Sequence, residues 1–461
     1  MPGLIWVLEA VLLGCLLVYR WTDLRAVNPR PARMLLIFGA GTAGGIGLTS
    51  CIFFLAGPLM KLAPADPLVE LALLAWVGYL CFRMPPHSPA SSPRLRSRLA
   101  VPLAAALVVT LVIAAAAILS GLEANPHGYW DAWAIWNLRA RFLISGGGLA
   151  ARAWSPVLGA TTHAAYPMLL SSFVARCWLF GNVTSAVVPA AASLAFFLAL
   201  VALVTGGIAV LRGGTLGLLA GLSIAATPSL LHQIPALYAD VPLACYMAGA
   251  VIFLLLEQPL PAGIFAALSA WTKDEGILFL LVFLAASAVW RRSAIRAVVA
   301  GALPVAVLLI GFKRFLAGGS SSLFFNSLPG AAHRILDPAR YGTVLSAFEH
   351  EFISMGIGWY HPLLPWAVLA VALGLDPKQR RTMFFVGAII LVLLAGDFGV
   401  YIVADNDLAW LVQTSLNRIL VQVWPLLAIA AFLALRSPDV FGPAPQLPAK
   451  SGRKARRATS R

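Results

Sequence analysis

Apolar runs of about twenty residues recur along most of this chain, and they constrain its fold more than any other feature. A helix of that length crosses the ~30 Å hydrocarbon layer of a bilayer. Lipid offers no hydrogen-bond partners, so a spanning backbone has to satisfy its own polar groups, and the alternating ten-residue segments of a β-barrel are not seen. Only 11% of the residues are charged, whereas soluble domains carry about a quarter. The sequence therefore predicts an all-α polytopic membrane protein.

The length criterion predicts about thirteen transmembrane helices. Their approximate positions are residues 3–19, 34–57, 66–84, 99–120, 184–206, 214–233, 241–256, 260–271, 276–290, 295–312, 363–375, 382–404 and 418–435. We group them into N-terminal helices (1–98), a central module (99–312), a C-terminal module with an external loop at 313–362 (313–436) and a basic disordered tail (437–461).

The formal net charge of +15 raises the question of a nucleic-acid partner. The basic residues, however, lie in short segments such as 83–98, 291–296 and 376–381, and in the tail. This distribution is typical of cytoplasmic loops and of tails that lie near anionic lipid. We therefore expect membrane lipids as partners and no nucleic acid.

The same loops indicate how the segment AYPMLLSSFVARCWLFG (165–181) is placed. If this segment crossed the membrane, every later basic loop would move to the opposite side, against the positive-inside pattern. We therefore expect 121–183 to form one long external loop with membrane-hugging helices. On this reading the turns at 233–240 and 272–275 and the segment 405–417 face the same outer side.

Asp131 is the most unusual residue of that loop, because it stands between tryptophans in GYWDAWAIWNLRARFL (128–143). The tryptophans alone are typical of an interfacial aromatic belt. A carboxylate at the membrane boundary is costly unless it is solvated or paired, which favours a functional role. Arg139 is a candidate partner for it or for a phosphate.

Four further positions carry polar residues on the outer side. A lone loop histidine such as His163, in HAAYPMLL, is more often structural than functional. For Asp240, in LYADVPL, the alternative to a functional role is that it caps a helix. For Lys273, Asp274 and Glu275, in SAWTKDEGILF, the alternative is that they are solvated charges at the tip of a hairpin.

Arg418 is the fourth of these positions, at the outer end of the last expected helix. Arginine on the outside runs against the positive-inside bias, which makes a phosphate partner plausible.

In this order the motifs resemble the GT-C-type glycosyltransferases, the polyprenyl-phosphate-sugar-dependent group that includes protein O-mannosyltransferases and the aminoarabinose transferase. The matching positions are Asp131, HAAYPMLL, Asp240 and TKDEG, over residues 99–312, with Arg418 beyond them. Ala132 stands where the family has a second acidic residue, and Pro167 is the single proline where it has two.

The resemblance implies a GT-C-like membrane fold and transfer of a hexose or pentose from a polyprenyl phosphate to an acceptor hydroxyl. The acceptor would be a lipid-linked glycan, a lipid or a protein. Asp131 would act as the general base, and Asp240 would position the acceptor or a cation. Lys273 and Arg418, with Arg139 as a further candidate, would balance the charge of the leaving phosphate.

No metal or other cofactor is expected. A divalent metal bridging Asp131, Asp240 and Asp274 is conceivable, but no ligand spacing demands it, and the five cysteines show no metal-binding spacing.

The main alternative is a multi-pass transporter or lipid flippase, for which charges inside the spans would argue. Glu9 and Asp397 are the main candidates for such charges, and no inverted repeat is evident. In a non-catalytic scaffold protein, Asp131 would have no function. The Ala- and Arg-rich composition favours a bacterial inner membrane, with the site facing the periplasm.

Overall fold

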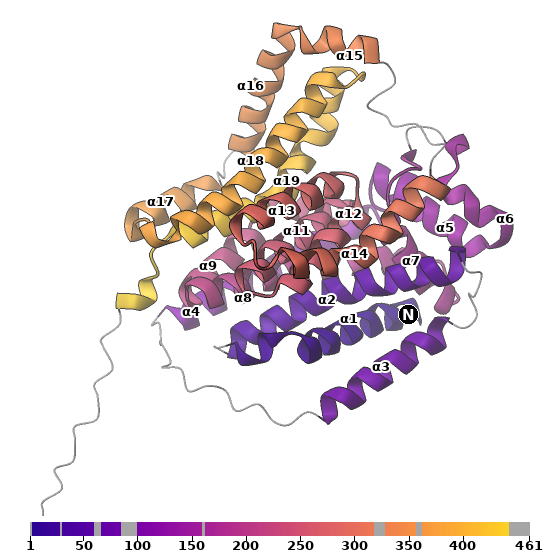
Figure 1. Cartoon of the computed structure of the whole chain (residues 1–461), viewed down its shortest axis with the longest axis horizontal. Helices are drawn as coiled ribbons and strands as arrows, with labels where there is room; N and C mark the ends of the chain where they lie inside the picture. The colour runs from indigo at the N-terminus through magenta and orange to yellow at the C-terminus, as the bar shows by residue number, and fades with distance from the viewer. Residues whose placement is uncertain are drawn as a thin grey trace, which may run out of the picture.

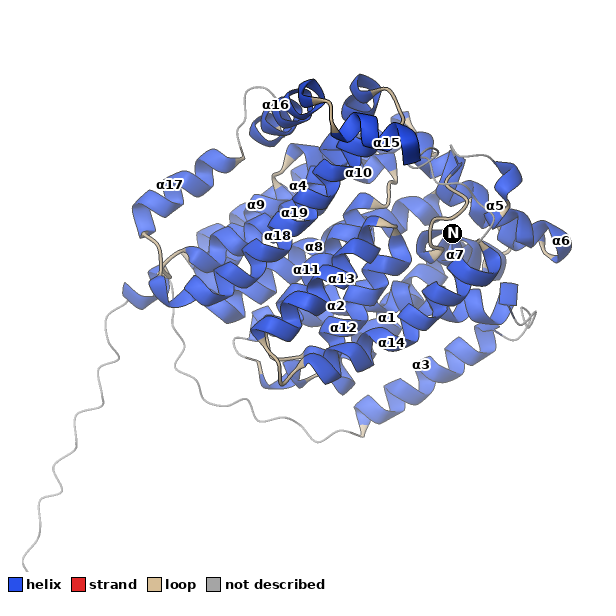
Figure 2. Ribbon diagram, turned by 45° about the horizontal axis from the view of Figure 1, so that its top comes forward, coloured by secondary structure: helices blue, strands red, loops and turns tan. Residues whose placement is uncertain are grey.

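The computed structural model describes residues 2–27, 30–59, 66–83, 99–158, 162–317, 328–355 and 362–441. The described chain is built from helices and their connections, with one isolated β-bridge between Leu375 and Leu435 (Figure 2). The expected all-α class is confirmed. Most of the expected tail, and residues 318–327 and 356–361 of the expected external loop 313–362, lie outside the described residues.

The helices follow one another as a long series. They are α1 (Pro2–Trp21), α2 (Arg30–Phe54), α3 (Asp66–Phe82), α4 (Ala100–Ala124), α5 (Asn137–Ser145), α6 (Gly147–Ala150), α7 (Leu169–Phe180), α8 (Val187–Arg212), α9 (Gly214–Ala225), α10 (Pro228–Ala236), α11 (Asp240–Leu255), α12 (Pro259–Thr272), α13 (Glu275–Trp290), α14 (Ile295–Gly311), α15 (Leu328–Ile335), α16 (Pro338–Ser354), α17 (Leu363–Leu373), α18 (Arg380–Val403) and α19 (Leu408–Ala434). Single π-helical turns occur at η2 (Leu55–Leu59), η4 (Ala132–Trp136) and η8 (Phe312–Leu316).

Helix α11 lies at the centre of the bundle, because its residues from Asp240 to Leu254 are all buried. It packs against α8, α12 and α19, while α2 packs against α1 and α8 on one side (Figure 1). Helices α15 and α16 lie beside α18, and α16 also contacts α19. A helix that is apolar all round and buried all round fits the core of a large bundle.

The outer helices expose apolar side chains rather than polar ones. On α4, the exposed fractions are 60% for Val108, 64% for Val112 and 64% for Ile113. An apolar surface of this size is compatible with lipid rather than with water. The fold is thus that of an all-α integral membrane protein.

Seven helices are long and apolar enough to span a bilayer, and an eighth is counted if α9 and α10, bent by 56°, form one broken span. The seven spans are Pro2–Trp21, Arg30–Gly57, Ala100–Ala124, Val187–Arg212, Ile295–Leu316, Pro377–Val403 and Leu408–Ala434. Several of the thirteen expected spans coincide with shorter apolar helices, among them α3, α11, α13 and α17. The expectation of thirteen spans is therefore not confirmed, whereas the expectation of apolar membrane helices is.

Two of the expected segments can be compared with the helices that they contain. The segment expected at 165–181 contains α7, whose 12 residues extend about 18 Å, too short to cross. Helix α7 is also buried from Leu169 to Trp178, against α1, α2 and α5. Helix α19 begins at Leu408, ten residues earlier than expected, so Arg418 lies within the helix rather than at its end.

A buried ion-pair group joins α1, α3 and α7. The fully buried guanidinium of Arg176 pairs with the carboxylates of Glu9 and Glu70. Burying charges away from water is tolerated where each has a partner of opposite sign. This contact attaches the peripheral helix α3 to the bundle.

Candidate active site

Arg418 links two carboxylates that come from distant parts of the chain. Its Nε donates to Asp240 Oδ2 at 3.0 Å, and its Nη2 donates to Asp131 Oδ2 at 2.5 Å. A guanidinium has a planar fork of donors and can therefore hold two acceptors at once. With Lys273 and Glu275, described next, these residues form what we call the ion-pair cluster: Asp131, Asp240, Lys273, Glu275 and Arg418.

Asp240 is the fully buried centre of the ion-pair cluster. Besides Arg418, its carboxylate accepts hydrogen bonds from Lys273 Nζ at 3.0 Å and from Gln422 Nε2 at 2.6 Å. Ala239 holds the N-cap position of α11, and no side chain caps this helix. The capping alternative for Asp240 is therefore wrong, and its carboxylate is instead committed to ion pairing.

Lys273 lies in the break between α12 and α13, two helices that pack against each other, and its extended backbone (φ −159°, ψ 158°) ends α12. Its Nζ pairs with Asp240 and, at 2.7 Å, with Glu275 Oε1. Burial lowers the pKa of Lys273, but attraction to the Asp240 and Glu275 carboxylates outweighs it and leaves this pKa above its ordinary value. Only 4% of the residue is exposed, so solvation at a hairpin tip is the wrong description of Lys273.

The segment before Asp131 is attached to the turn between α10 and α11. Gly128 adopts φ +72°, and a Cβ there would lie 2.5 Å from the Ala236 carbonyl oxygen. The next residue, Tyr129, donates its N–H to that carbonyl at 3.1 Å. Only glycine allows both the left-handed conformation and the close approach. Asp131 is thereby held beside the start of α11, where Asp240 lies.

The tryptophans that flank Asp131 do not share one environment. Trp130 and Trp133 are about half exposed, at 52% and 49%, whereas Trp136 is buried at 2%. The π-helical turn η4 contains Trp133 and Trp136, and it rotates the helix that follows relative to the chain that precedes it. The aromatic-belt expectation thus suits Trp130 and Trp133, while Trp136 belongs to the core.

Arg418 is also fixed by an aromatic face. Its guanidinium carbon lies 4.2 Å from the centroid of the Tyr238 ring, in the turn before α11. The preceding residue, Asn417, donates to Glu351 Oε1 of α16 at 2.6 Å and to Ser229 of α10 at 3.2 Å. A cation over an aromatic ring is stabilised by the ring quadrupole. These contacts place α16 directly over the part of α19 that carries Arg418.

Asp274, the neighbour of Lys273, makes a separate ion pair with a residue that the sequence did not identify. Lys313 Nζ donates to Asp274 Oδ1 at 2.6 Å and to the Ala165 carbonyl at 2.7 Å. Lys313 lies in the π-helical turn η8 that continues α14. This pair brings residues after 312 to the same end of the bundle as Asp131, Asp240 and Arg418.

His163 lies near the cluster but stacks on Tyr166, with ring centroids 4.3 Å apart. Its backbone is left-handed, at φ 45°, which is uncommon for a residue other than glycine. Burial, followed by repulsion from Lys273 and Arg418, lowers the pKa of His163 to about 3. The imidazole is therefore neutral at physiological pH and is a weak base.

Arg139, expected to pair with Asp131 or a phosphate, has a structural environment. It is fully buried, and it donates to the Ala153 carbonyl at 2.8 Å and to the Tyr166 carbonyl at 2.6 Å. These bonds tie α5 to the loop that contains His163. These hydrogen bonds of Arg139 lie in the loop core rather than in the ion-pair cluster.

The ion-pair cluster is closed in this conformation. The side chain of Arg418 is 16% exposed and that of Asp131 is 13% exposed. A cavity of about 420 Å³ is lined by Trp133 and Asn137, from the segment that follows Asp131, and by Trp178, but by none of the five cluster residues. A ligand would therefore reach Asp131 only if Arg418 or its surroundings move.

Among the described residues, no group of three His, Cys, Asp or Glu side chains is arranged to hold a metal ion. The positive charge between Asp131 and Asp240 is supplied by Arg418 instead.

Comparisons with models of protein families, with curated protein sequences and with solved structures find no match for this chain.

Proposed function

We propose that the chain is a GT-C-type membrane glycosyltransferase, which moves a sugar from a polyprenyl-phosphate-linked donor to an acceptor hydroxyl. The observation that supports this most is the Arg418 guanidinium shared by Asp131 and Asp240. Arg418, an outer-side cation, joins Asp131 of the first long loop to Asp240, at the start of a later helix. In the GT-C enzymes that the sequence resembles, an acidic residue in the first external loop and an acidic residue before a later span recur in this order.

In the proposed reaction the acceptor oxygen attacks the anomeric carbon while the bond from that carbon to the phosphate oxygen breaks. The electron pair leaves with the polyprenyl phosphate, and Asp131 takes the proton of the acceptor hydroxyl. A carboxylate is suited to this role and to an oxocarbenium-like transition state. Asp131 is bound to Arg418 in the closed cluster, so we propose that donor binding draws Arg418 away from it.

Charge balance indicates which cations would meet the phosphate. The ion-pair cluster has three carboxylates against two cations, so a further anion would be repelled unless a cation is freed or added. Lys273 is enclosed by Asp240 and Glu275, with 6% of its side chain exposed. Lys313 is more accessible, at 29%. We therefore propose that Arg418 and Lys313 bind the phosphate and that Lys273 positions Asp240.

The proposal includes a membrane topology. We propose about thirteen spans, with the shorter apolar helices also embedded, and 121–183 as a long external loop of the GT-C kind. The positive-inside pattern would place the cluster on the outer side, which is the periplasm if the chain resides in a bacterial inner membrane. Acceptors there include lipid-linked glycans, lipids and proteins.

A transporter or flippase remains the second candidate, and two features favour it. Arg176, Glu9 and Glu70 place charges among the apolar helices, and α9 and α10 form a bent pair. Charges and broken helices of this kind line substrate paths in transporters. Arg176 is fully buried by its two partners, however, which suits a structural role equally well.

The direct test is to incubate the purified protein with a panel of polyprenyl-phosphate-linked hexoses and pentoses. We expect release of polyprenyl phosphate and transfer of the sugar with at least one donor. The same sugars linked to a nucleoside diphosphate serve as the control. Movement of intact donor across a vesicle membrane without cleavage would instead support a flippase and contradict the proposal.

A further inference from the structure

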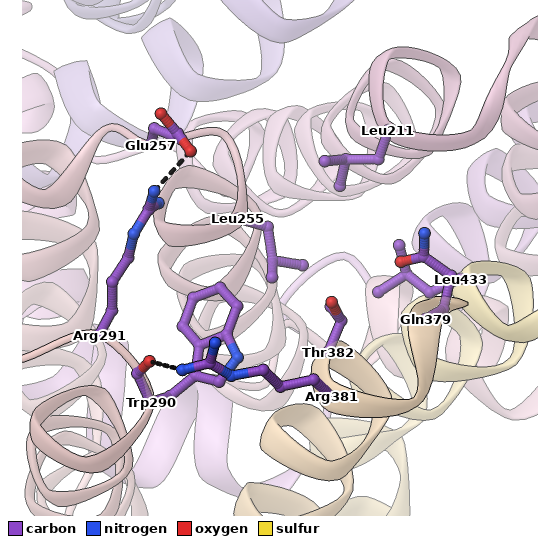
Figure 3. Close-up of a pocket in the computed structure, with 9 residues that line it drawn as sticks. All are labelled: Leu211, Leu255, Glu257, Trp290, Arg291, Gln379, Arg381, Thr382 and Leu433. Carbon is purple, nitrogen blue, oxygen red and sulfur yellow. Dashed lines mark hydrogen bonds and ion pairs between the residues drawn. The ribbon is translucent and has the colours of Figure 1, made fainter. Parts of the chain in front are cut away.

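A cavity lies at the other end of the bundle from the ion-pair cluster. Helices α11 and α13 each begin at the cluster, with Asp240 and Glu275, and each is 16 residues long and ends at Leu255 or Trp290, respectively. At 1.5 Å per residue they extend about 24 Å. Leu255 and Trp290 both line a cavity of about 380 Å³ (Figure 3). This cavity is therefore separate from the proposed active site.

One wall of the cavity is polar and positively charged. Arg291 and Arg381 line it together with Thr382. Figure 3 shows Arg381 reaching from α18 to the end of α13, where its Nη2 donates to the Trp290 carbonyl at 3.0 Å. Arg291 pairs with Glu257, whose side chain is 72% exposed and therefore largely solvated. The wall thus has two guanidinium groups and a single, water-exposed carboxylate.

The other wall is apolar. Leu211 of α8, Leu255 of α11 and Leu433 of α19 line it. The indole of Trp290 stacks on Phe385, with ring centroids 4.5 Å apart, which fixes the ring at the cavity wall. Its Nε1 is buried and has no hydrogen-bond partner among the described residues. A ligand that fills this cavity must therefore combine anionic and apolar parts.

We propose that this cavity binds the phosphate group of an anionic phospholipid, with Arg291 and Arg381 as the phosphate ligands. Guanidinium groups match the geometry of phosphate oxygens, and the Thr382 hydroxyl adds a further donor. The three leucines contact the start of the acyl chains. Basic pockets between membrane helices bind anionic headgroups in this way. A free phosphate would leave the apolar wall in contact with water.

The charge of the surrounding surface fits an anionic ligand. The helix ends and connections around the cavity carry further basic residues: Arg212, Arg292, Arg296, Lys378, Arg380 and Arg436. Positive residues at one end of the helices mark the side that faces anionic lipid in the cytoplasmic leaflet. The inference rests on the membrane embedding of the helices and is independent of the proposed transferase activity.

The test is a binding titration that does not depend on enzymatic activity. The purified full-length chain in a neutral detergent is titrated with short-chain phosphatidylglycerol, phosphatidylcholine or inorganic phosphate, and bound ligand is followed by native mass spectrometry. Arg291→Gln/Arg381→Gln removes the two cavity cations. Arg292→Gln/Arg380→Gln makes the same charge change at neighbouring positions that do not line the cavity.

We expect phosphatidylglycerol to bind in preference to phosphatidylcholine. Loss of the two cavity arginines should weaken phosphatidylglycerol binding by about thirtyfold, the effect of two basic residues at a lipid headgroup. The neighbouring double variant should bind within about threefold of wild type. Equal weakening in both variants would show diffuse attraction and overturn the site, and tight binding of inorganic phosphate alone would overturn the assignment to a lipid.

Discussion

At the scale of single residues, the candidate active site depends on Asp240. It is fully buried and accepts hydrogen bonds from Lys273, Arg418 and Gln422. A buried carboxylate with three donors is stable because both of its oxygens accept hydrogen bonds, and its removal leaves Lys273 and Arg418 with one carboxylate partner each, Glu275 and Asp131. Asp240 is therefore as important for the folded bundle as for any reaction at its surface.

We predict that Asp240→Asn destabilises the protein by about 3–5 kcal/mol, the usual cost of breaking a buried ion pair from one side. Glu257→Gln makes the same chemical change in a pair where the carboxylate is 72% exposed, and should cost less than about 1 kcal/mol. Thermal unfolding in detergent, monitored by circular dichroism, compares the two. Equal stability of both variants would contradict the role of Asp240.

Sequence reasoning identified the unusual charges but not their pairing. Asp131 and Arg418 are 287 positions apart, and no local pattern links them. Lys313 is not among the predicted site residues because the predicted span ends at residue 312, although an outer-side lysine breaks the positive-inside rule as Arg418 does. Gln422 lies four residues after Arg418, and this spacing puts both side chains on one face of the helix.

At the scale of elements, the position of Asp131 is determined by the chain that leads into η4. Gly128 packs against the end of α10, and Tyr129 donates to the Ala236 carbonyl there. The π-helical turn then directs Trp136 into the core. The carboxylate is therefore carried by a segment attached at both of its ends, which suits a group that must meet Arg418 in one geometry.

Gly128→Ala should displace this segment. Its new Cβ would lie 2.5 Å from the Ala236 carbonyl oxygen and 2.7 Å from the Ala132 Cβ. Gly146→Ala has a similar left-handed φ of +68° but meets no atom within 4 Å, so it reports the backbone strain alone. We expect about 1–2 kcal/mol of destabilisation for Gly146→Ala and about 1–3 kcal/mol more for Gly128→Ala. The free energies of unfolding in denaturant compare the two variants. An equal loss of stability in both would show that the packing at Gly128 is loose.

The sequence contains start signals that predict where several helices begin. Asp407 caps α19, its carboxylate accepting the Trp410 N–H at 2.8 Å, so the sequence DNDLAW contains a start signal ten residues before the expected one. Pro228 opens α10 and marks the bend after α9. By contrast, the burial of α7 depends on α1, α2 and α5, and no local pattern shows it.

At the scale of the whole molecule, the two ends of the bundle have different chemistry. The ion-pair cluster lies at one end, with Asp131, Asp240 and Arg418, and the basic cavity with Arg291 and Arg381 lies at the other. Helices α11 and α13 connect the two. This polarity is the property that a membrane enzyme with a defined orientation requires.

The orientation can be measured with single cysteines in a cysteine-free background. Val157, which is 81% exposed in the loop 121–183, and Ser293, which is exposed between α13 and α14, mark the two ends. We predict that a membrane-impermeant maleimide labels Val157→Cys in intact cells and labels Ser293→Cys only after the membrane is opened. Labelling of both positions from outside would contradict the proposed topology.

We propose that Asp131, held by Arg418, is the general base of a sugar transfer. The most direct measurement compares the turnover of Asp131→Asn and Asp405→Asn with a polyprenyl-phosphate-linked sugar that the wild type uses. Asp405 provides the matched control, since its carboxylate also pairs with an arginine, Arg334, outside the cluster. We predict that Asp131→Asn lowers turnover by about 10²–10⁴-fold while it still binds the donor, and that Asp405→Asn stays close to wild type. Turnover of Asp131→Asn equal to that of the wild type would show that Asp131 is not the general base.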